Sequence, residues 1–325
     1  MKYRNFIETI SQWTRESFFF KRVARTASNA EIALHKNEPN EVFATKMYRR
    51  YTGKTLNLEN PRSFNEKLWW LKIHYRNPLQ KVCSDKYRVR EYVSQMGLPH
   101  LLTRLYGVYD RADDVDFDLF KEEVFLKCNL GSACNIIYDP SKRFNRRQFI
   151  WDFNSALQHD YYQNSREWNY KDVPAKIICE EVLRDKDGNL PRDYKFMCFG
   201  GKPKLLFLSE GACDSEGRHS VGGVRFTNIY DMDFKLVPMR SSYPVNANAS
   251  IVKPDTFETM KKYASILSEP FPHCRVDFYT FNNRVYFGEL TFYHSGGCGV
   301  VEPEEWANRM GDWIDLSQIK NEYLA

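Results

Sequence analysis

The stretch RVDFYTFNNRVYFGELTFYHSGG, which starts at Arg275, contains two carboxylates, Asp277 and Glu289. Their spacing could bring them together in a site that does chemistry. The Asn-Asn pair between two apolar, aromatic-rich runs predicts a β-hairpin, because Asn tolerates the positive φ of tight turns. With a three-residue loop at 282–284, Asp277 pairs with Glu289 and Arg275 pairs with Thr291 on one face. Carboxylates directly opposite each other repel. Such a pair is therefore typical of a shared proton or a bound divalent cation.

The other residue types in this stretch suit phosphoryl transfer. Arg275 offers a planar donor fork for an anionic oxygen. Thr291 adds a neutral oxygen beside Asp277 and Glu289, so the hairpin has oxygen ligands for a hard cation such as Mg²⁺. An exposed ion cluster without any ligand is the plainer alternative, because such surface charges are common.

A second candidate region lies upstream, in the stretch VFLKCNLGSACNIIY. It places Lys127 at the end of an apolar strand, four residues before a turn at Gly131 and Ser132. Backbone N–H groups in such a turn can bind phosphate oxygens, while the lysine ammonium neutralises their charge. Taken alone, this pattern has low specificity.

Two further acidic positions follow apolar strands. Glu180 and Glu181 come directly after the run AKIIC and suit an adenine amino group or ribose hydroxyls. Asp193 and Lys195 alternate along DYKFMCFGG, so they lie on one face of a strand as an acid–base pair.

The elements that must position these residues are helices mixed with antiparallel hairpins, which indicates an α+β fold rather than a doubly wound sheet. Ser63 and Glu66 have capping-box spacing at the start of one amphipathic helix. The other helices are expected over residues 3–50, 78–95, 144–162 and 255–269. No βαβ unit precedes residue 120, so no Rossmann half is visible.

Composition excludes several classes of function. The chain has 325 residues, and no apolar run approaches the ~20 residues that span a bilayer. Eight cysteines without CxxC spacing favour a reducing cytoplasm over a disulfide framework or a zinc site. Residues 1–56 carry eleven Lys and Arg against five Glu. That basic segment either is a solvated helical face or contacts an anionic membrane surface, and no nucleic-acid-binding module is recognised.

The order of these pieces is more specific than any one of them. From about residue 45 to 315, the chain resembles the TupA-like ATP-grasp family of cell-surface polysaccharide gene clusters. The resemblance rests on these segments: PRSFNEKLWWLK, DKYRVREYV, FLKCNLGSACNII, REWNYK, EEVL, DYKFMCFGGKPK, RVDFY and YFGELTFYHSGG. It implies an ATP-grasp fold, in which two α+β lobes with antiparallel sheets clasp ATP, preceded by a helical N-terminal region.

The implied organisation has four parts. A helical N-terminal region spans 1–60, and an N-terminal subdomain that leads into the ATP-grasp spans 61–123. The small lobe, or lid, spans 124–184, and the C-terminal lobe with the Mg²⁺ and phosphate site spans 185–325.

The resemblance also implies residue roles. Arg275 and Lys195 would be catalytic, and Mg²⁺ would be held by Asp277, Glu289 and Thr291. ATP would be bound by Lys86, Lys127, Gly131, Ser132, Ala133, Glu180, Glu181, Leu183, Asp193 and Lys195. Two positions depart from the family pattern, because Ala133 replaces a usual second glycine and Thr291 stands where ATP-grasp ligases commonly carry Asn.

Candidate substrate residues lie in three loops. An aromatic platform beside charged groups suits a sugar ring, and the stretch NSREWNYK has that composition, although a packed Trp is an equally good explanation. The turn after the metal strand could bind a carboxylate or acyl phosphate through its N–H groups. The candidates are Arg166, Glu167, Trp168, Arg225, His294, Ser295 and Gly296.

Known ATP-grasp enzymes phosphorylate a carboxylate and then let an amine attack the acyl phosphate. We therefore expect a bacterial, cytoplasmic, ADP-forming carboxylate–amine ligase that uses ATP and Mg²⁺. Its expected partners are a carboxylate-bearing glycan or sugar, such as a uronic acid, and an amine or amino acid. The pathway would be capsular, O-antigen or teichuronic-type polysaccharide biosynthesis, with peripheral contact at the inner face of the membrane as a further hypothesis. The sequence sets no oligomeric state.

Three alternatives stay open at this stage. An ATP-grasp sugar kinase would use the same ATP site, and a binding scaffold would use it without catalysis. A glycosyltransferase would use an Asp-x-Asp metal motif, although about one such match is expected by chance in this chain. The matches start at Asp114, Asp116, Asp185 and Asp231.

Overall fold

The computed structural model describes residues 18–132, 134–185, 187–210, 226–246, 248 and 251–325. Ala133 and Arg225, two of the expected site residues, lie outside the described residues. So does the part of the basic segment 1–56 that precedes residue 18. The α-helices are α2 (Phe18–His35), α3 (Asn40–Thr52), α4 (Phe64–His74), α5 (Leu79–Ser84), α6 (Val89–Gln95), α7 (Arg146–Leu157), α8 (Tyr161–Ser165), α9 (Phe257–Ser268) and α10 (Glu304–Asp312). The short 3-10 helices are η1 (Pro99–Leu101), η2 (Ala112–Asp114), η3 (Phe117–Leu119), η4 (Trp168–Tyr170), η5 (His294–Gly297), η6 (Leu316–Gln318) and η7 (Asn321–Tyr323).

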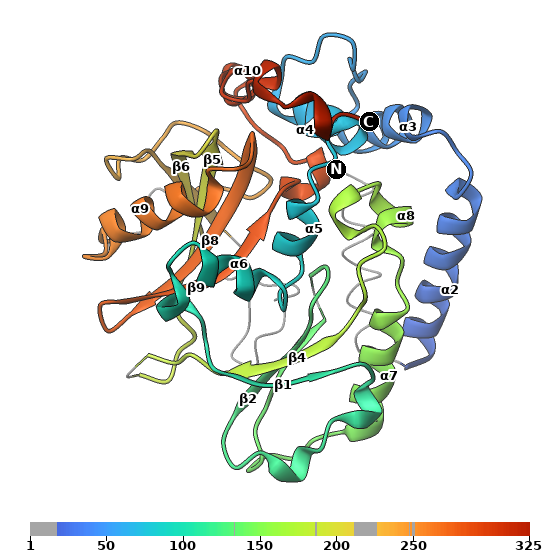
Figure 1. Ribbon diagram of the computed structural model, residues 1–325, viewed down its shortest axis with the longest axis vertical. Coiled ribbons are helices and arrows are strands. Elements are labelled where there is room, and N and C mark those ends of the chain that lie inside the picture. Colours follow the sequence, from blue (N-terminus) through green and yellow to red (C-terminus); the bar gives the residue numbers. More distant parts are fainter. Residues whose placement is uncertain (1–17, 133, 186, 211–225, 247, 249–250) are drawn as a thin grey trace.

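Two antiparallel sheets form the framework (Figure 1). The small sheet has the order β1-β4-β2-β3, and the large sheet has the order β7-β6-β5-β8-β9. The small-sheet strands are β1 (Leu105–Tyr109), β2 (Val124–Cys128), β3 (Asn135–Tyr138) and β4 (Ile177–Glu181). The large-sheet strands are β5 (Asp193–Phe199), β6 (Lys202–Glu210), β7 (Phe226–Tyr230), β8 (His273–Phe281) and β9 (Arg284–Thr291). The predicted α+β class with antiparallel sheets is confirmed.

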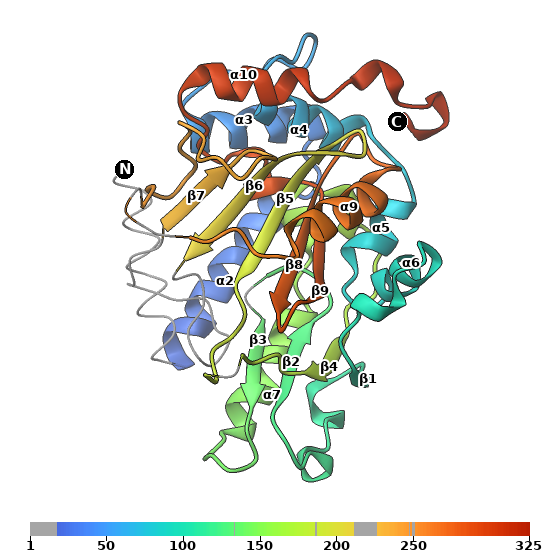
Figure 2. The same cartoon turned by 90° about the vertical axis from the view of Figure 1, so that its left-hand side faces the viewer.

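Each sheet is covered by helices on one side. The helix α9 packs on β5, β6 and β8, and α7 packs on β2. Figure 2 shows α3, α4 and α10 across one end of the large sheet, with the small sheet at the opposite end of the molecule. A third apolar cluster joins α3 to α4 through Phe43, Tyr48 and Trp69. The alternation of β5 leaves Asp193 and Lys195 half-buried on the uncovered face, while their neighbours point into the core.

The expected helix over 78–95 is wrong in one respect, because it is interrupted between α5 and α6. The carboxylate of Asp85 accepts hydrogen bonds from the backbone N–H groups of Tyr87 (2.8 Å) and Arg88 (3.3 Å). Side-chain oxygens of this kind compete with helical hydrogen bonds and start a new turn. The break places Lys86 in a linker, where its backbone N–H bonds Asn129 O at 3.0 Å.

Two other expected helices are also divided. The described part of 3–50 consists of α2 and α3, and Pro39 occupies the N-cap of the second helix. The helix expected over 144–162 consists of α7 and α8, each capped at its start by the side chain of Asn145 or Asp160. Single-residue caps therefore set boundaries that apolar periodicity does not mark.

The hairpin of β8 and β9 has the predicted side-chain pairs but a different turn. Phe281 pairs with Arg284 across a two-residue turn, not with Val285 across three residues. A bulge between Asp277 and the next residue shifts the ladder by one. It accommodates Gly288, where a Cβ would lie 3.0 Å from Asp277 O. The bulge thus restores the predicted register beyond it.

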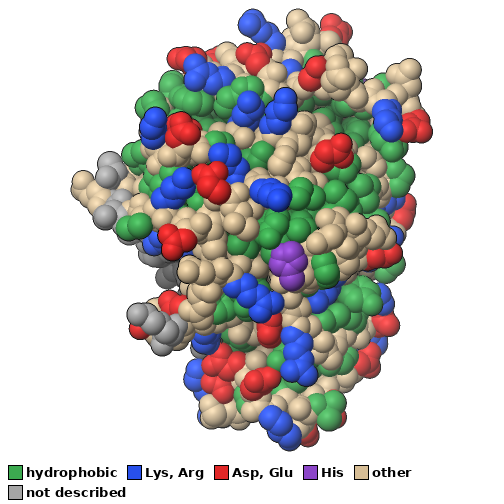
Figure 3. Space-filling model, turned by 60° about the vertical axis from the view of Figure 1, so that its left-hand side comes forward, with side chains coloured by type: hydrophobic (Ala, Val, Ile, Leu, Met, Phe, Trp, Pro, Cys, Tyr) green, Lys and Arg blue, Asp and Glu red, His purple; other side chains and the backbone are tan. Residues whose placement is uncertain are grey.

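Within the described part of the chain, no helix is long and apolar enough to cross a membrane. Figure 3 shows Lys and Arg side chains interspersed with Asp and Glu over the face that carries α9, without a single large basic patch on that face.

Candidate functional site

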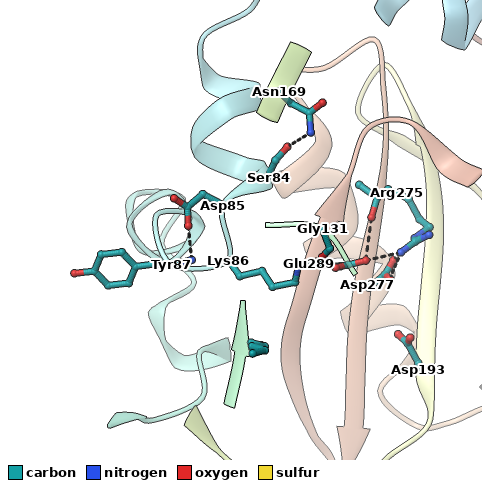
Figure 4. A network of polar contacts seen from close by, with 12 residues as sticks. Ser84, Asp85, Lys86, Tyr87, Gly131, Asn169, Asp193, Arg275, Asp277 and Glu289 are labelled. Carbon is teal, nitrogen blue, oxygen red and sulfur yellow. Dashed lines mark hydrogen bonds and ion pairs between the residues drawn. The ribbon is translucent and has the colours of Figure 1, made fainter. Parts of the chain in front are cut away.

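One guanidinium joins the two paired carboxylates of β8 and β9 (Figure 4). Arg275 Nε and Nη2 donate to the two carboxylate oxygens of Asp277, both at 2.6 Å, and Nη2 also donates to Glu289 Oε1 at 2.7 Å. Asp277 lies opposite Glu289 in the ladder, as predicted. The repulsion expected between the acids is offset by this shared cation. Asp277 is only 2% exposed, so the cluster is not a plain surface ion pair.

The neighbouring strand β5 adds the second predicted acid–base pair. Lys195 lies opposite Asp277, and its ammonium is 3.0 Å from Asp277 Oδ2 while also bonding Asp193. Burial opposes the charged form of Lys195, but Asp193 and Asp277 outweigh it and raise the pKa of the ammonium. Burial raises the pKa of Asp193, against the effect of Lys195. Lys195 is therefore held as a cation between two acids.

A third cation reaches the cluster from the linker between α5 and α6. Lys86 Nζ lies 3.8 Å from Glu289 Oε2 and donates to Gly131 O at 2.6 Å (Figure 4). Burial lowers the pKa of Lys86, and Glu289 partly offsets that effect. This side chain thus connects the loop of the small sheet with the acidic strand of the large sheet.

Glu289 is ionised by the charges around it. Burial alone would raise the pKa of its carboxyl, but Lys86, Arg275 and Lys195 together lower the pKa to about 2. Burial likewise disfavours the charged form of Arg275, and Asp277 and Glu289 outweigh it to raise the guanidinium pKa. Three cationic side chains therefore converge on two buried or half-buried acids, which is an arrangement suited to anionic oxygens.

Two neutral groups complete the edge of the cluster. Thr291 Oγ1 donates to Glu289 Oε1 at 3.1 Å. His294 Nδ1 lies 3.2 Å from Arg275 Nη1. Because a guanidinium can only donate, Nδ1 accepts this bond, and a neutral His294 must carry its proton on Nε2. His294 Nδ1 is thus engaged by Arg275.

The loop between β2 and β3 is anchored from both ends. Gly131 has φ of 68°, and a Cβ there would lie 2.2 Å from the ring of Tyr161. Asn129 is fully buried, and its amide bonds Lys176 N at 2.7 Å and Pro174 O at 3.0 Å. Ser132 is exposed at the tip. The predicted phosphate loop thus contacts Lys86 through the Gly131 carbonyl. A side chain at Gly131 would need both a positive φ and a shift of the Tyr161 ring.

The predicted nucleotide residues of the small sheet form a separate ion cluster. Lys127 Nζ lies 2.6 Å from Glu180 Oε2, and Arg90 Nη1 lies 2.9 Å from Glu180 Oε1. Glu181 instead accepts the backbone N–H of Arg104 at 3.0 Å. Leu183 is half-buried just beyond β4. The structure therefore brings Lys127 and Glu180 together, whereas sequence reasoning gave them different contacts.

The donor set fits Mg²⁺ that is shared with phosphate oxygens. In the part of the chain that the structure describes, no three His, Cys, Asp or Glu side chains are grouped to hold a metal alone. Asp277 and Glu289, with the Thr291 hydroxyl, would therefore need phosphate or water oxygens to complete the six ligands that Mg²⁺ demands. Both oxygens of Asp277 are hydrogen-bonded, and Glu289 is the more exposed acid.

The expected acceptor loop has mainly structural contacts. Arg166 is 3% exposed, and its guanidinium donates to the backbone carbonyls of His35 and Glu38. Trp168 lies against the ammonium of Lys81, 4.6 Å from the ring centroid. The structure does not bring Arg166 or Trp168 to the Arg275 cluster. Glu167 instead lies beside the turn after β9, since a Cβ on Gly296 would be 3.9 Å from its Oε1.

The turn after β9 is unusual in its backbone. Ser295, Gly296 and Gly297 have φ of 50°, 62° and 74°, so three successive residues adopt left-handed conformations. A serine in this conformation costs of order 1 kcal/mol or more and is often retained at functional sites. Lys72 fixes the turn by donating to Gly296 O at 2.6 Å.

Three of the four Asp-x-Asp motifs considered for a glycosyltransferase act as turn caps. Asp116, Asp185 and Asp231 each accept the backbone N–H of the second Asp of their own motif, at 2.9 to 3.0 Å. These contacts account for the motifs without a metal.

Sequence reasoning missed Arg90, Asn129 and Lys72. Arg90 lies in DKYRVREYV, four residues after Lys86, but nothing in that stretch marks it as a partner of Glu180. Asn129 directly follows β2, but nothing in its sequence context marks its amide as the anchor of the loop. Lys72 lies on the apolar face of α4, where a charged residue signals a buried partner.

Comparisons with known proteins identify the family of this chain. The sequence matches the family model TupA-like ATPgrasp over residues 66–315, which is more than half of the chain. A comparison with curated protein sequences gives no match.

Several solved structures share part of the architecture. D-alanine–D-alanine ligase from Bacillus anthracis is 13% identical, covers 70% of this chain and 63% of its own, and has a TM-score of 0.40. L-amino acid ligase from Bacillus licheniformis is 12% identical, with coverages of 66% and 44% and a TM-score of 0.41. D-alanine–D-alanine ligase from Helicobacter pylori is 11% identical, with coverages of 80% and 69% and a TM-score of 0.42. This chain thus spans less than two thirds of the first two ligases. From the family match over residues 66–315, the chain belongs to the TupA-like ATP-grasp family.

Proposed function

We propose that this chain is an ATP-dependent, ADP-forming ligase that joins a carboxylate to an amine through an acyl phosphate. One observation carries the proposal: Arg275 bridges Asp277 and Glu289 while Lys195 and Lys86 approach the same two acids. Fixed cations around ionised oxygen ligands suit the charge distribution of phosphoryl transfer.

In the first step, a carboxylate oxygen of the substrate attacks the γ-phosphorus of ATP, and the bond to the β-phosphate oxygen breaks to release ADP. Arg275 and Lys195 offset the negative charge on the transferring group, because both are held as cations by Asp277. Lys86 is placed to contact the phosphates from the other side, beside Gly131. Mg²⁺, bound through Asp277 and Glu289, would neutralise phosphate charge.

In the second step, the amine nitrogen attacks the carbonyl carbon of the acyl phosphate, loses a proton and displaces inorganic phosphate. The η5 turn lies next to the cluster through His294, whose Nδ1 is 3.2 Å from Arg275 Nη1, so backbone N–H groups of this turn are proposed to bind the carbonyl or phosphate oxygen. A closed loop at 129–132 would exclude water, which otherwise hydrolyses acyl phosphates.

The nucleotide base and ribose are assigned to the small-sheet side. Glu180 and Glu181 end β4, and Lys127 and Arg90 surround the first of these acids. The substrates are a uronic acid or related carboxylate on a cell-surface glycan and an amine such as an amino acid. Support for that choice comes from the family association with polysaccharide gene clusters, together with a site suited to anionic oxygens.

The test uses the full chain with ATP and Mg²⁺, a uronic acid glycoside and a panel of amino acids. ADP release that requires both substrates, with a product whose mass equals an amide, supports the ligase. A phosphorylated sugar as the stable product would identify a kinase instead. ADP release that is independent of any carboxylate would contradict the proposal.

Glu289→Gln is the informative variant, and Glu322→Gln is its matched control, because Glu322 is an exposed carboxylate whose nearest charge is Lys320 at 3.7 Å. Turnover should disappear in the first and persist in the second. Full activity in Glu289→Gln would remove the assigned site.

A further inference from the structure

A cavity of about 250 Å³ lies where α2, α3, α4 and α8 meet the η5 turn. Its lining includes the turn residues Ser295 and Gly296 and the side chain of Trp69. We propose that this cavity binds the sugar ring of the carboxylate substrate, an inference that rests on the ligase function proposed above. The ring site is thus placed around Trp69 rather than at the Trp168 loop.

The turn connects this cavity to the Arg275 cluster. His294 directly precedes Ser295, and its Nδ1 is 3.2 Å from Arg275 Nη1. On the cavity side, the carbonyl of Gly296 is fixed by Lys72. The cavity and the Arg275 cluster therefore lie on the two sides of the same turn.

The one lysine that lines the cavity is already fully engaged. Lys72 is 2% exposed, and its ammonium bonds Gly296 O at 2.6 Å and Ser165 O at 3.3 Å. The same ammonium lies 3.9 Å from the Trp69 ring centroid and 4.0 Å from Glu167 Oε1. Two hydrogen bonds, one ion pair and one ring contact thus engage this ammonium with protein groups, so it is not directed at a ligand carboxylate.

The carboxylate and the imidazole of the described lining, Glu31 and His35, are paired as well. Glu31 Oε1 lies 2.5 Å from Arg50 Nη1, and His35 Nδ1 lies 2.8 Å from Glu38 Oε2. A free amino acid would require an unpaired cation for its carboxylate and an unpaired anion for its ammonium. These pairings favour a neutral ligand body over an amino acid zwitterion.

The remaining lining suits a hydroxylated ring. Met47 and Tyr51 supply accessible apolar wall beside the buried rings of Phe43 and Trp69, while Asn164 and Ser295 supply an amide and a hydroxyl at exposed positions. A sugar ring has apolar C–H groups and hydroxyls that match both kinds of surface. The volume is below the roughly 300–1,000 Å³ of pockets for drug-sized ligands, so it suits one ring and not a nucleotide.

The cavity also combines two parts of the chain. The helices α2 and α3 precede residue 66, where the family match begins, whereas Trp69 and the η5 turn lie inside it. Figure 1 shows α2 running alongside α8 on one flank of the molecule. The ring would therefore be selected partly by helices that the family match does not include.

The experiment measures binding of methyl β-glucuronide and of the neutral methyl β-glucoside to the full chain by calorimetry and ligand-observed NMR. Asn164→Trp places an indole at the cavity wall, and Gln95→Trp on the exposed end of α6 is the matched control. Both glycosides should bind the wild type. Their affinity should fall at least about tenfold in Asn164→Trp, or about 1.4 kcal/mol, and stay unchanged in the control.

A rise in the Tm of Asn164→Trp on addition of ATP shows that the variant is folded. If that rise is absent, Asn164→Ala replaces it, with a smaller expected loss of glycoside affinity. Absence of glycoside binding, or equal binding in Asn164→Trp and the control, would overturn the cavity assignment. If glycosides bind in the expected pattern but no carboxylate supports ADP release, the ligase proposal fails and the ring site stands. If ADP release occurs with an unchanged KM for the glucuronide in Asn164→Trp, the cavity assignment alone fails.

Discussion

Changing Glu289 to Gln removes one charge from the cluster while keeping the shape of the side chain. Folding lowers the pKa of Glu289 from 4.5 to about 2. At about 1.4 kcal/mol per pKa unit, that difference corresponds to an upper bound of roughly 3 kcal/mol of stability at neutral pH. The side chain is 35% exposed, so solvent screening reduces the expected contribution to about 1–2 kcal/mol.

The sign follows from the lowered pKa. A carboxylate whose pKa is depressed by folding contributes its full stability above its unfolded pKa, here 4.5, and loses it as the pH falls toward about 2. Glu289→Gln should therefore be less stable than the wild type by about 1–2 kcal/mol at neutral pH. The gap between the two proteins should narrow steadily as the pH is lowered below 4.5.

Urea unfolding followed by circular dichroism, in steps from about pH 7 to the lowest pH at which both proteins remain folded, measures this gap. Glu322→Gln is the control, because Glu322 lies exposed near the C-terminus. A stability difference that is the same at every pH would refute the reasoning, since it would mean that Glu289 is not held as an anion by its neighbours.

Three other substitutions give distinct expected results. Lys86→Met should raise the Kd for ATP, measured by calorimetry, at least about tenfold. Lys262→Met, on the exposed face of α9, should leave the Kd unchanged. Equal Kd values for the two variants would remove Lys86 from the phosphate site. Gly288→Ala should cost about 1–3 kcal/mol and lower turnover, because its Cβ would press on Asp277 O at 3.0 Å; unchanged urea unfolding and turnover would mean that the bulge absorbs the methyl group. Ser63→Ala should cost about 1 kcal/mol through loss of the α4 capping box and leave ATP affinity intact, and a changed affinity would contradict a purely local role.

The hairpin shows how a sequence prediction can be right for an incomplete reason. Period-two alternation and the Asn-Asn signal were enough to predict that Asp277 faces Glu289 and that Arg275 faces Thr291. The turn is one residue shorter than expected, and the bulge at Gly288 compensates. A bulge depends on how two strands meet, and a lone glycine in a strand only suggests one.

Contacts between separate elements were harder to predict. The pairing of Lys127 with Glu180 joins β2 and β4, and it depends on a strand order that the sequence does not encode locally. The approach of Lys86 to Glu289 likewise depends on the Asp85 cap, a competition between one side chain and a helix. Residue types and family spacing were enough to predict which residues belong to the site. Which of these residues contact each other could be known only from the tertiary arrangement.

The burial of Arg166 has a practical consequence for shortening this protein. Its guanidinium donates to the carbonyls of His35 and Glu38, at the corner between α2 and α3. It also donates to the backbone carbonyl and the side-chain oxygen of Gln163. Cutting the chain at residue 66, where the family match starts, would remove the His35 and Glu38 carbonyls and would also remove Phe43, Ala44 and Tyr48 from the apolar cluster that they form with Trp69 and Ile73. Trp69 and Ile73 are 2% and 3% exposed in the full chain and would lose that cover. Exposing a fully buried side chain such as Ile costs roughly 1.5–3 kcal/mol. The boundary drawn by sequence relatedness is therefore not the boundary of the unit that folds.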